Sequence, residues 1–196
     1  MTGIAGGAAL AAVLYERGFD VDALLLAACA RLRAAGVRVG GMIQTSSGGR
    51  GACAASVQVV DLASGQAFDI WESRGVRARG CRLDEAGLLE TEPLLRAAIA
   101  DGVDLLVINR FGRAEGLGRG VIGVFAAAIE AGVPVLTATR PPYDAAWRAF
   151  HGGMGRDLMP DPDAVLTWAL LNTRVEPAHS PSPTRVLPRA LSSTIP

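Results

Sequence analysis

Two short apolar segments, residues 103–109 and 133–139, restrict the fold of this chain more than any other feature. Each follows a glycine, each is rich in Val, Leu or Ile, and neither alternates regularly between apolar and polar residues. A continuous apolar run of this length indicates a strand that is buried on both faces, which is typical of a parallel sheet. Parallel neighbours need a crossover connection, and residues 121–131 between them have a helical pattern.

Strands and helices alternate along most of the chain. Asp20 is a suitable N-cap for the first helix, and Pro93 is expected to interrupt a longer helix near its middle. Ser64 and Gly65 predict the turn of a β-hairpin. The expected strands are 8–15, 37–44, 56–62, 67–71, 103–109 and 133–139, and the expected helices are 21–35, 84–101, 121–131, 143–150 and 163–172. This order favours an α/β fold in which a mostly parallel sheet carries helices on both faces and an inserted hairpin.

The composition predicts one domain followed by a tail. Residues 1–174 contain enough apolar side chains to form the core of a single α/β domain. Residues 175–196 are rich in proline and serine, so they can bury little apolar surface and are predicted to be disordered. Residues 45–51 and 72–83 are expected to be loops, because they are polar and without a regular period.

Charge and composition disfavour several classes of function. The formal net charge is +0 and the pI is about 6.7, so the basic face of a nucleic-acid-binding protein is not expected. No apolar run is long enough to insert into a membrane. The three cysteines include no Cys-x-x-Cys pair, which argues against a zinc or redox motif and favours a reducing, cytoplasmic setting. No metal site is predicted.

The chain has no lysine, so all 19 of its Lys and Arg residues are arginine. Three of them, Arg110, Arg113 and Arg119, follow the apolar strand 103–109 closely. Guanidinium groups hold oxyanions in fixed geometry, and the free N–H groups at a helix start also attract anions. We therefore expect these arginines, together with Asn109 and Gly112, to bind a doubly charged tetrahedral oxyanion.

Two other loops are expected to contribute to the same crevice. Arg82 would approach the anion from a facing loop, and the hydroxyl groups of Ser46 and Ser47 would donate hydrogen bonds to it. The alternative is that Glu115 and Asp84 pair with the arginines and lock two loops together, since ion-pair networks are common at strand ends.

Four segments of the sequence resemble a bacterial family of unknown function. They are residues 36–44, 80–84, 104–115 and 132–138, and the resemblance extends over roughly residues 8–158. Members of that family are often encoded beside molybdate-transport genes. The resemblance therefore implies a setting in molybdenum handling and a partner in a transport system.

A more distant resemblance is to the small P-loop nucleoside-triphosphatases, which implies a three-layer, P-loop-like fold. The hairpin at 60–65 and the strand end that carries Asn109 are similar to theirs. Asn109 stands where those enzymes have a magnesium-organising aspartate, Arg110 stands where they have a catalytic glutamate, and Glu115 is retained. The loop 16–22 has one glycine, and the carboxylates of Asp20 and Asp22 stand where phosphate would lie, so the phosphate loop is degenerate. Both carboxylates are expected to cap the first helix and complement its dipole.

Three functions remain open at this point. The first is a non-hydrolysing oxyanion-binding protein for molybdate, tungstate or phosphate, since the lysine of an ordinary phosphate loop is missing. The second is a nucleotide-binding protein or weak nucleoside-triphosphatase, in which Glu115 would act as the base. The third is a regulatory or scaffold subunit of a transport or metalloenzyme-assembly system, acting with a partner or as a homo-oligomer.

Overall fold

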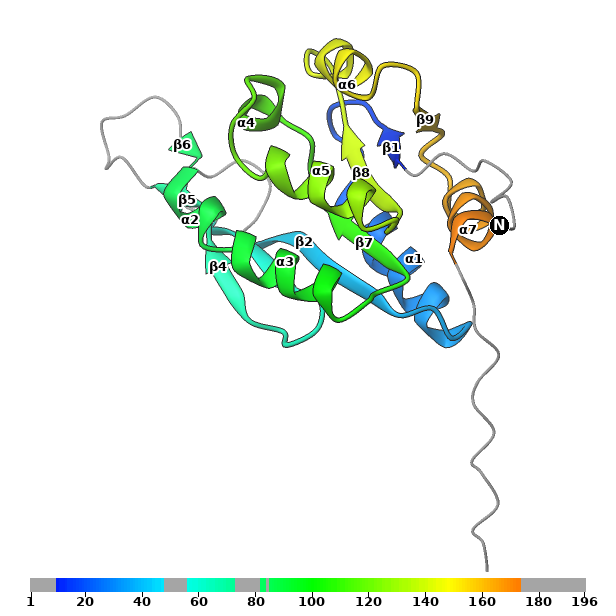
Figure 1. Cartoon of the computed structure of the whole chain (residues 1–196). Coiled ribbons are helices and arrows are strands. Elements are labelled where there is room, and N and C mark those ends of the chain that lie inside the picture. The colour runs from blue at the N-terminus through cyan, green and yellow to red at the C-terminus, as the bar shows by residue number, and fades with distance from the viewer. Residues whose placement is uncertain (1–9, 48–55, 73–81, 84, 174–196) are drawn as a thin grey trace, which may run out of the picture.

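The computed structural model describes residues 10–47, 56–72, 82–83 and 85–173 (Figure 1). The strands are β1 (Leu10–Leu14), β2 (Val39–Ser47), β3 (Ser56–Asp61), β4 (Ala67–Asp69), β5 (Trp71–Glu72), β6 (Arg82–Leu83), β7 (Leu105–Ile108), β8 (Val135–Thr139) and β9 (Gly155–Leu158). The helices are α1 (Val21–Ala34), α2 (Glu85–Leu89), α3 (Glu92–Ala100), α4 (Arg113–Gly116), α5 (Ile122–Glu130), α6 (Asp144–His151) and α7 (Pro162–Asn172).

Seven of these strands form one sheet in the order β4-β3-β2-β7-β8-β1-β9. The pairs β2–β7, β7–β8, β8–β1 and β1–β9 are parallel, whereas β3 and β4 run antiparallel to their neighbours. The predicted hairpin is confirmed, and its turn is closed by the Asp61 carboxylate, which accepts hydrogen bonds from the backbone N–H and hydroxyl of Ser64. The mostly parallel sheet with an inserted hairpin agrees with the fold expected from the sequence.

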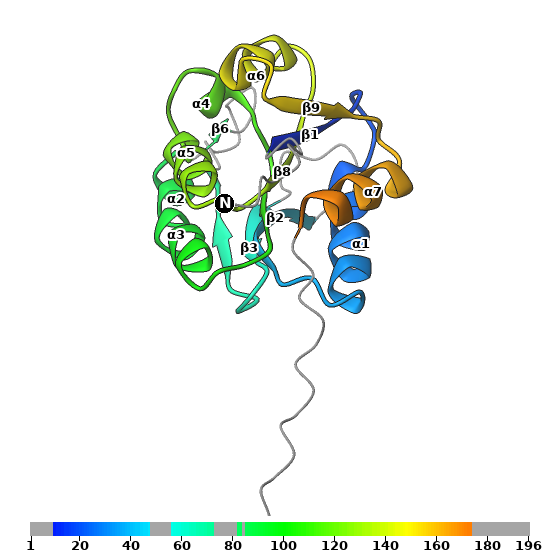
Figure 2. The same cartoon turned by 45° about the vertical axis from the view of Figure 1, so that its right-hand side comes forward.

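Helices cover both faces of the sheet, as Figure 2 shows, and each face has its own apolar core. Alternate residues of one strand enter different cores: Leu105 and Val107 pack with α1 and α7, while Leu106 and Ile108 pack with α3 and α5. All four residues of β7 are buried. The double-sided burial explains why this strand appears in the sequence as a continuous apolar run.

The helix boundaries follow ordinary capping and proline rules. The Asp20 carboxylate accepts a hydrogen bond of 3.0 Å from the backbone N–H of Ala23, which confirms the predicted cap of α1. The helix expected over 84–101 is divided into α2 and α3, and Pro93 lies in the first turn of α3. Proline has no N–H to donate, so the first turn is the one place in a helix where it costs little.

Several local expectations need correction. β2 continues to Ser47 and pairs with β3, so the start of the predicted loop 45–51 is strand. The predicted loop 72–83 has a short β-bridge pair, β5 with β6, at its two ends. The strand β9 and the short helix α4 were not expected. Residues 48–55, 73–81, 84 and the predicted tail 175–196 lie outside the described residues.

Among the helices that the structure describes, none combines the length and apolar character needed to span a membrane.

Candidate functional site

Several strands end at one edge of the sheet, and the loops that follow them gather there. β1, β7, β8 and β9 are parallel, so the loops at 15–20, 109–112, 140–143 and 159–161 lie at the same edge. Ligands of open α/β sheets bind in the crevice outside the carboxyl ends of the strands. This carboxyl edge, where the loops after β1, β7, β8 and β9 lie, is the candidate functional site.

An acidic residue in the first turn of α1 ties two of these loops together. One carboxylate oxygen of Asp22 accepts a hydrogen bond of 2.6 Å from the Asn109 amide, and the other pairs with the Arg110 guanidinium at 2.6 Å. The side chains are only 18% exposed for Asp22 and 29% exposed for Arg110. The pair is therefore partly shielded from water, and its Coulomb attraction exceeds that of a surface ion pair.

Phe111 anchors the loop that carries Asn109 and Arg110. It is 1% exposed, and its ring makes edge contacts with Phe125 at 6.0 Å and Trp147 at 5.4 Å between centroids. Its backbone N–H donates to the carbonyl of Ala138 in β8. The loop after β7 therefore leaves the sheet in a fixed direction, and the Arg110 guanidinium is held on the side of α1.

Three of the buried side-chain polar atoms that have no hydrogen-bond partner among the described residues lie at the ends of β7 and β8. They are Asn109 Oδ1, Arg110 Nε and Thr139 Oγ1. Asn109 is 6% and Thr139 is 1% exposed. An unpaired buried polar atom costs roughly 1–3 kcal/mol. The edge thus presents an acceptor, a donor and a hydroxyl that a bound molecule or water would satisfy.

Glu115, the residue retained from the nucleoside-triphosphatase pattern, is 5% exposed. Its carboxylate accepts hydrogen bonds from the backbone N–H groups of Gly112 at 3.1 Å and Val121 at 3.4 Å. These contacts close the loop that begins at Gly112 and contains α4. In this arrangement the carboxylate braces a loop, whereas a catalytic base needs an open path to a water or hydroxyl group.

The other residues expected at the site are placed less closely together. Arg113 begins α4 and Arg119 precedes α5, and both are exposed. Arg119 therefore lies in the loop before α5 and not at the helix start expected from the sequence. Arg82 lies in β6, and Ser46 and Ser47 end β2. The side chains of these last three residues lie outside the described part of the structure.

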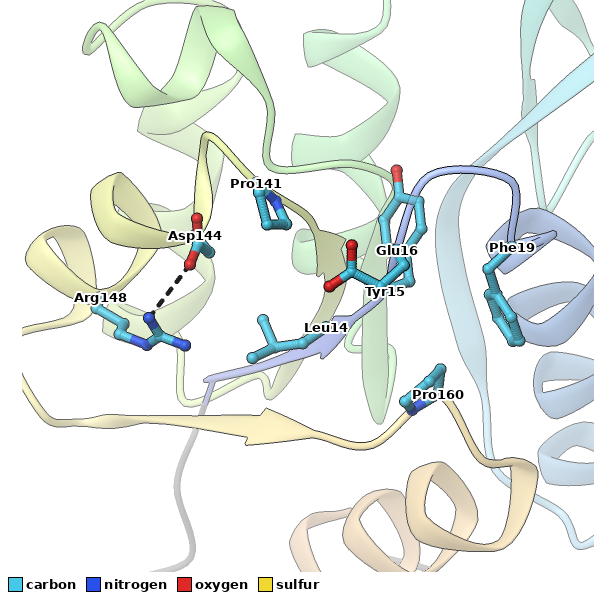
Figure 3. Close-up of a pocket in the computed structure, with 8 residues that line it drawn as sticks. All are labelled: Leu14, Tyr15, Glu16, Phe19, Pro141, Asp144, Arg148 and Pro160. Atoms are coloured by element: carbon cyan, nitrogen blue, oxygen red, sulfur yellow. Dashed lines mark hydrogen bonds and ion pairs between the residues drawn. The ribbon is translucent and has the colours of Figure 1, made fainter.

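A pocket of about 480 Å³ opens at the same edge beside the loop after β1 (Figure 3). Its apolar walls come from three different loops and from the end of β1, and consist of Leu14, Phe19, Pro141 and Pro160. Tyr15 also lines it, and the Arg110 guanidinium lies over the Tyr15 ring, 5.6 Å from its centroid. Tyr15 is thus common to the lining of the pocket and to the surroundings of the Asp22–Arg110 pair.

The charged side chains of the pocket are unevenly partnered. Arg148 pairs with Asp144 at 3.3 Å and with Asp157 at 2.9 Å, and these two carboxylates raise the pKa of its guanidinium. The carboxylate of Glu16 has no hydrogen-bond or ion-pair partner among the described residues, although its backbone carbonyl accepts from the N–H of Phe19. Figure 3 shows its carboxylate directed toward the space between Leu14 and the Asp144–Arg148 pair.

Sequence reasoning missed the pocket residues and the bridging role of Asp22. Asp22 was expected only to complement the helix dipole, but its partner Arg110 is 88 residues away in the chain. The fold topology could have predicted this pairing, because the start of the helix after one parallel strand and the end of another parallel strand lie at the same edge of the sheet. Among the described residues, no group of three or more His, Cys, Asp or Glu side chains is arranged to hold a metal ion.

The sheet order, the helices on both faces and the loops at the carboxyl edge define an α/β protein with the fold of the P-loop nucleoside-triphosphatases. A human cancer-related nucleoside triphosphatase, solved in solution, superposes with a TM-score of 0.55 and 18% identity, over 81% of this chain and 92% of that one. At this identity the similarity concerns the fold alone.

The chain belongs to the family described as "Protein of unknown function (DUF2478)", which matches residues 10–168. A curated relative is the molybdenum import ATP-binding protein ModC 2 of Bradyrhizobium diazoefficiens, which is 38% identical over 159 residues. The match covers 81% of this chain but only 18% of that protein. The chain therefore corresponds to less than a fifth of the length of this relative.

Proposed function

We propose that the protein is a non-hydrolysing oxyanion-binding member of the P-loop-like fold, with a ligand of the molybdate, tungstate or phosphate type. The observation that carries the proposal is the state of Arg110. Its guanidinium lies at the carboxyl edge, one of its terminal nitrogens pairs with Asp22, and its buried Nε has no partner among the described residues. A second anion acceptor beside Arg110 would satisfy that donor.

Exposed cations on the same loop support the proposal. Arg113 and Arg119 lie three and nine residues after Arg110 and are accessible to a dissolved anion. Arginine binds tetrahedral oxyanions through two parallel N–H donors, so a shell of arginines suits such a ligand without any lysine. Asn109, Gly112, Arg82, Ser46 and Ser47 complete the proposed binding shell.

Hydrolysis of a nucleoside triphosphate is disfavoured by the same geometry. The Asp22 carboxylate occupies the first turn of α1, where a phosphate group would otherwise meet free backbone N–H groups. Phosphoryl transfer also needs magnesium and a cationic clamp on the transferred group. Asn109 and the buried Glu115 are engaged in contacts within the protein, so neither is placed to organise magnesium.

The cellular setting that we propose is molybdenum handling. It draws on the relative named as a molybdenum import ATP-binding protein, together with the family's expected occurrence beside molybdate-transport genes. Because the match covers only a small part of that relative, the ATP binding in its name is not transferred to this chain. The proposed ligand is accordingly the oxyanion.

Nucleotide binding is the second candidate, because the fold is that of the nucleoside-triphosphatases and a pocket of about 480 Å³ lies at the loop after β1. A pocket of this volume is large enough for a nucleoside. In this candidate Glu115 would act as a weak catalytic base. Magnesium-dependent phosphate release that is lost in Glu115→Gln would favour it over the first proposal.

Calorimetric titration with molybdate, tungstate, sulfate and magnesium ATP tests the first proposal. We expect at least one oxyanion to bind, no phosphate release from ATP, and about tenfold weaker oxyanion binding in the Arg113→Gln/Arg119→Gln variant, a loss of about 1.4 kcal/mol. The control variant Arg31→Gln/Arg156→Gln removes two exposed arginines elsewhere and should bind like the wild type. Absence of binding, or equal weakening in both variants, would refute the proposal.

A further inference from the structure

The pocket beside Tyr15 is too large and too apolar for an inorganic anion. Its volume is about 480 Å³, within the range of sites that bind small organic molecules, and Leu14, Phe19, Pro141 and Pro160 provide apolar surface on several sides. A tetrahedral oxyanion would leave most of that volume to water. Phe19 is 41% exposed, so its ring is accessible to a planar group that stacks on it.

The charges of the pocket point to the same conclusion. Arg148 is the cation that lines it, and its charge is shared between Asp144 and Asp157. With Glu16 added, the lining carries more negative than positive charge. An anion would be repelled, whereas a neutral ring that carries N–H donors would be attracted.

Glu16 supplies the specific polar group. Its carboxylate has two oxygens, accepts hydrogen bonds only, and is not engaged by another described residue. Two N–H donors that lie side by side on a planar ring match these two oxygens. A 2-amino-4-oxopyrimidine ring, the ring shared by guanine and the pterins, presents such a pair at the 2-amino group and the adjacent ring N–H, which is N1–H in guanine and N3–H in a pterin. Adenine has only one donor on that edge, and hypoxanthine lacks the amino group.

We propose that this pocket binds a planar heterocycle with a 2-amino-4-oxopyrimidine edge, with Glu16 accepting its two N–H groups and Phe19 stacking on its face. Tyr15 lines the pocket and its ring lies under the Arg110 guanidinium, so the pocket extends toward Arg110. A phosphate or other anionic group attached to the ring would reach that guanidinium. The ring site itself does not depend on the oxyanion binding proposed above.

Titration of the full chain with guanosine, neopterin, adenosine and inosine tests this proposal, with calorimetry or tryptophan fluorescence as the measure of binding. We expect guanosine or neopterin to bind at least about tenfold more tightly than adenosine and inosine, because the last two leave one carboxylate oxygen unpaired. The better of the first two identifies the source of the ring. Comparable affinity for adenosine, or no binding of any of the four, would refute the proposal.

Two variants separate the proposed contacts. Glu16→Gln keeps the side-chain shape but replaces one acceptor with a donor, and should weaken guanosine or neopterin binding at least about tenfold. Phe19→Ala removes the stacking surface and should weaken the same ligand severalfold. Glu130→Gln, an exposed glutamate at the end of α5, is the matched control and should bind like the wild type. Unchanged binding in Glu16→Gln would refute the assigned role.

Further titrations distinguish this proposal from its alternatives. Spermidine, a flexible cation, should not compete with guanosine. Competition that depends on Glu16 would refute the proposed ring and indicate that the natural ligand is an amine. Glu16→Gln should keep its oxyanion affinity, and Arg113→Gln/Arg119→Gln should keep its guanosine affinity. Failure of the ring site and failure of oxyanion binding are therefore separate results.

Discussion

Cys29 lies on the inner face of α1 and is only 1% exposed. Burial raises the pKa of its thiol to about 11, although the nearby charge of Arg33 opposes the shift. Below that pH the side chain is a neutral, packed thiol, and the thiolate that reacts with electrophiles is scarce. This cysteine therefore contributes to the core and not to chemistry at the carboxyl edge.

We expect native Cys29 to resist alkylation. In a Cys53→Ser/Cys81→Ser background, iodoacetamide near pH 9 should modify Cys29 at least about a hundredfold more slowly in the folded protein than in denaturant, because the raised pKa and the burial both remove accessible thiolate. Mass spectrometry of timed samples measures the ratio. Equal rates in the two states would show that the thiol is exposed.

The same shift gives a pH dependence of known sign. Between about pH 9 and about pH 11 the unfolded chain releases a proton that the folded chain keeps, so the free energy of unfolding should fall as the pH rises through this range. Cys29→Ala should remove this part of the slope while lowering stability at all pH values. An identical slope in the variant would contradict the assignment.

At the scale of the elements, Gly41 controls how closely β2 approaches β7. Its φ is +109°, and a Cβ added there would overlap the backbone of Val107 in β7. Gly36, just after α1, also has a positive φ of +87° but faces open space. The two glycines therefore separate the cost of backbone strain from the cost of a clash.

Gly36→Ala should lower the free energy of unfolding by about 1 kcal/mol, the usual cost of an L residue with positive φ. Gly41→Ala should lower it by more than about 3 kcal/mol, because backbone atoms cannot move aside as a flexible side chain can. Urea denaturation of the two variants measures both values. Similar losses in the two would show that β2 and β7 are free to separate.

The elements that sequence patterns predicted well are those whose burial leaves a clear signal. β7 and β8 are buried on both faces and therefore stand out as apolar runs. β9 was missed because it is the outermost strand of the sheet and its residues Arg156 and Asp157 are exposed, so the strand has no apolar pattern. α4 spans only Arg113–Gly116, which is too short for a helical period to appear.

The candidate site was less predictable than the fold. The position of Arg110 at a strand end followed from the apolar run before it, but its pairing with Asp22 depends on how two distant elements meet. The pocket is assembled from loops after three different strands, and no local pattern links Glu16 to Pro141 or Pro160. Tertiary contacts of this kind become visible only when the strand order is known.

At the scale of the whole molecule, one arginine–aspartate pair lies at each end of the parallel strands: Arg38–Asp104 at the amino ends and Asp22–Arg110 at the carboxyl ends. At the amino edge Arg38 precedes β2 and contacts Asp104 before β7 at 2.8 Å. Burial alone would raise the pKa of the Asp104 carboxyl, but hydrogen bonds and charge from Arg38 hold it below its usual value. This pair adds stability at neutral pH that is lost as acid protonates the carboxyl.

At the carboxyl edge the Asp22–Arg110 pair uses a cation that a ligand would otherwise bind. Asp22→Asn keeps the shape of the side chain and an oxygen that accepts from the Asn109 amide, but it removes the negative charge that pairs with the Arg110 guanidinium. On the proposed function, we expect oxyanion affinity to rise about tenfold in this variant, while the free energy of unfolding falls by about 1–3 kcal/mol because a partly buried charge loses its partner. Saturating anion should then restore much of the lost stability, since a ligand that binds only the folded state stabilises it.

Calorimetric titration and thermal unfolding, with and without molybdate, measure the two effects in the same variant. Asp163→Asn is the matched control: its partner Arg31 is also paired through one carboxylate oxygen, but both side chains are more than half exposed, so neither quantity should change appreciably. Lower or unchanged oxyanion affinity in Asp22→Asn would contradict the assignment of Arg110 as an anion ligand. A rise in oxyanion affinity with no loss of stability would show that the Asp22–Arg110 pair does not stabilise the fold and only competes with the anion for the guanidinium.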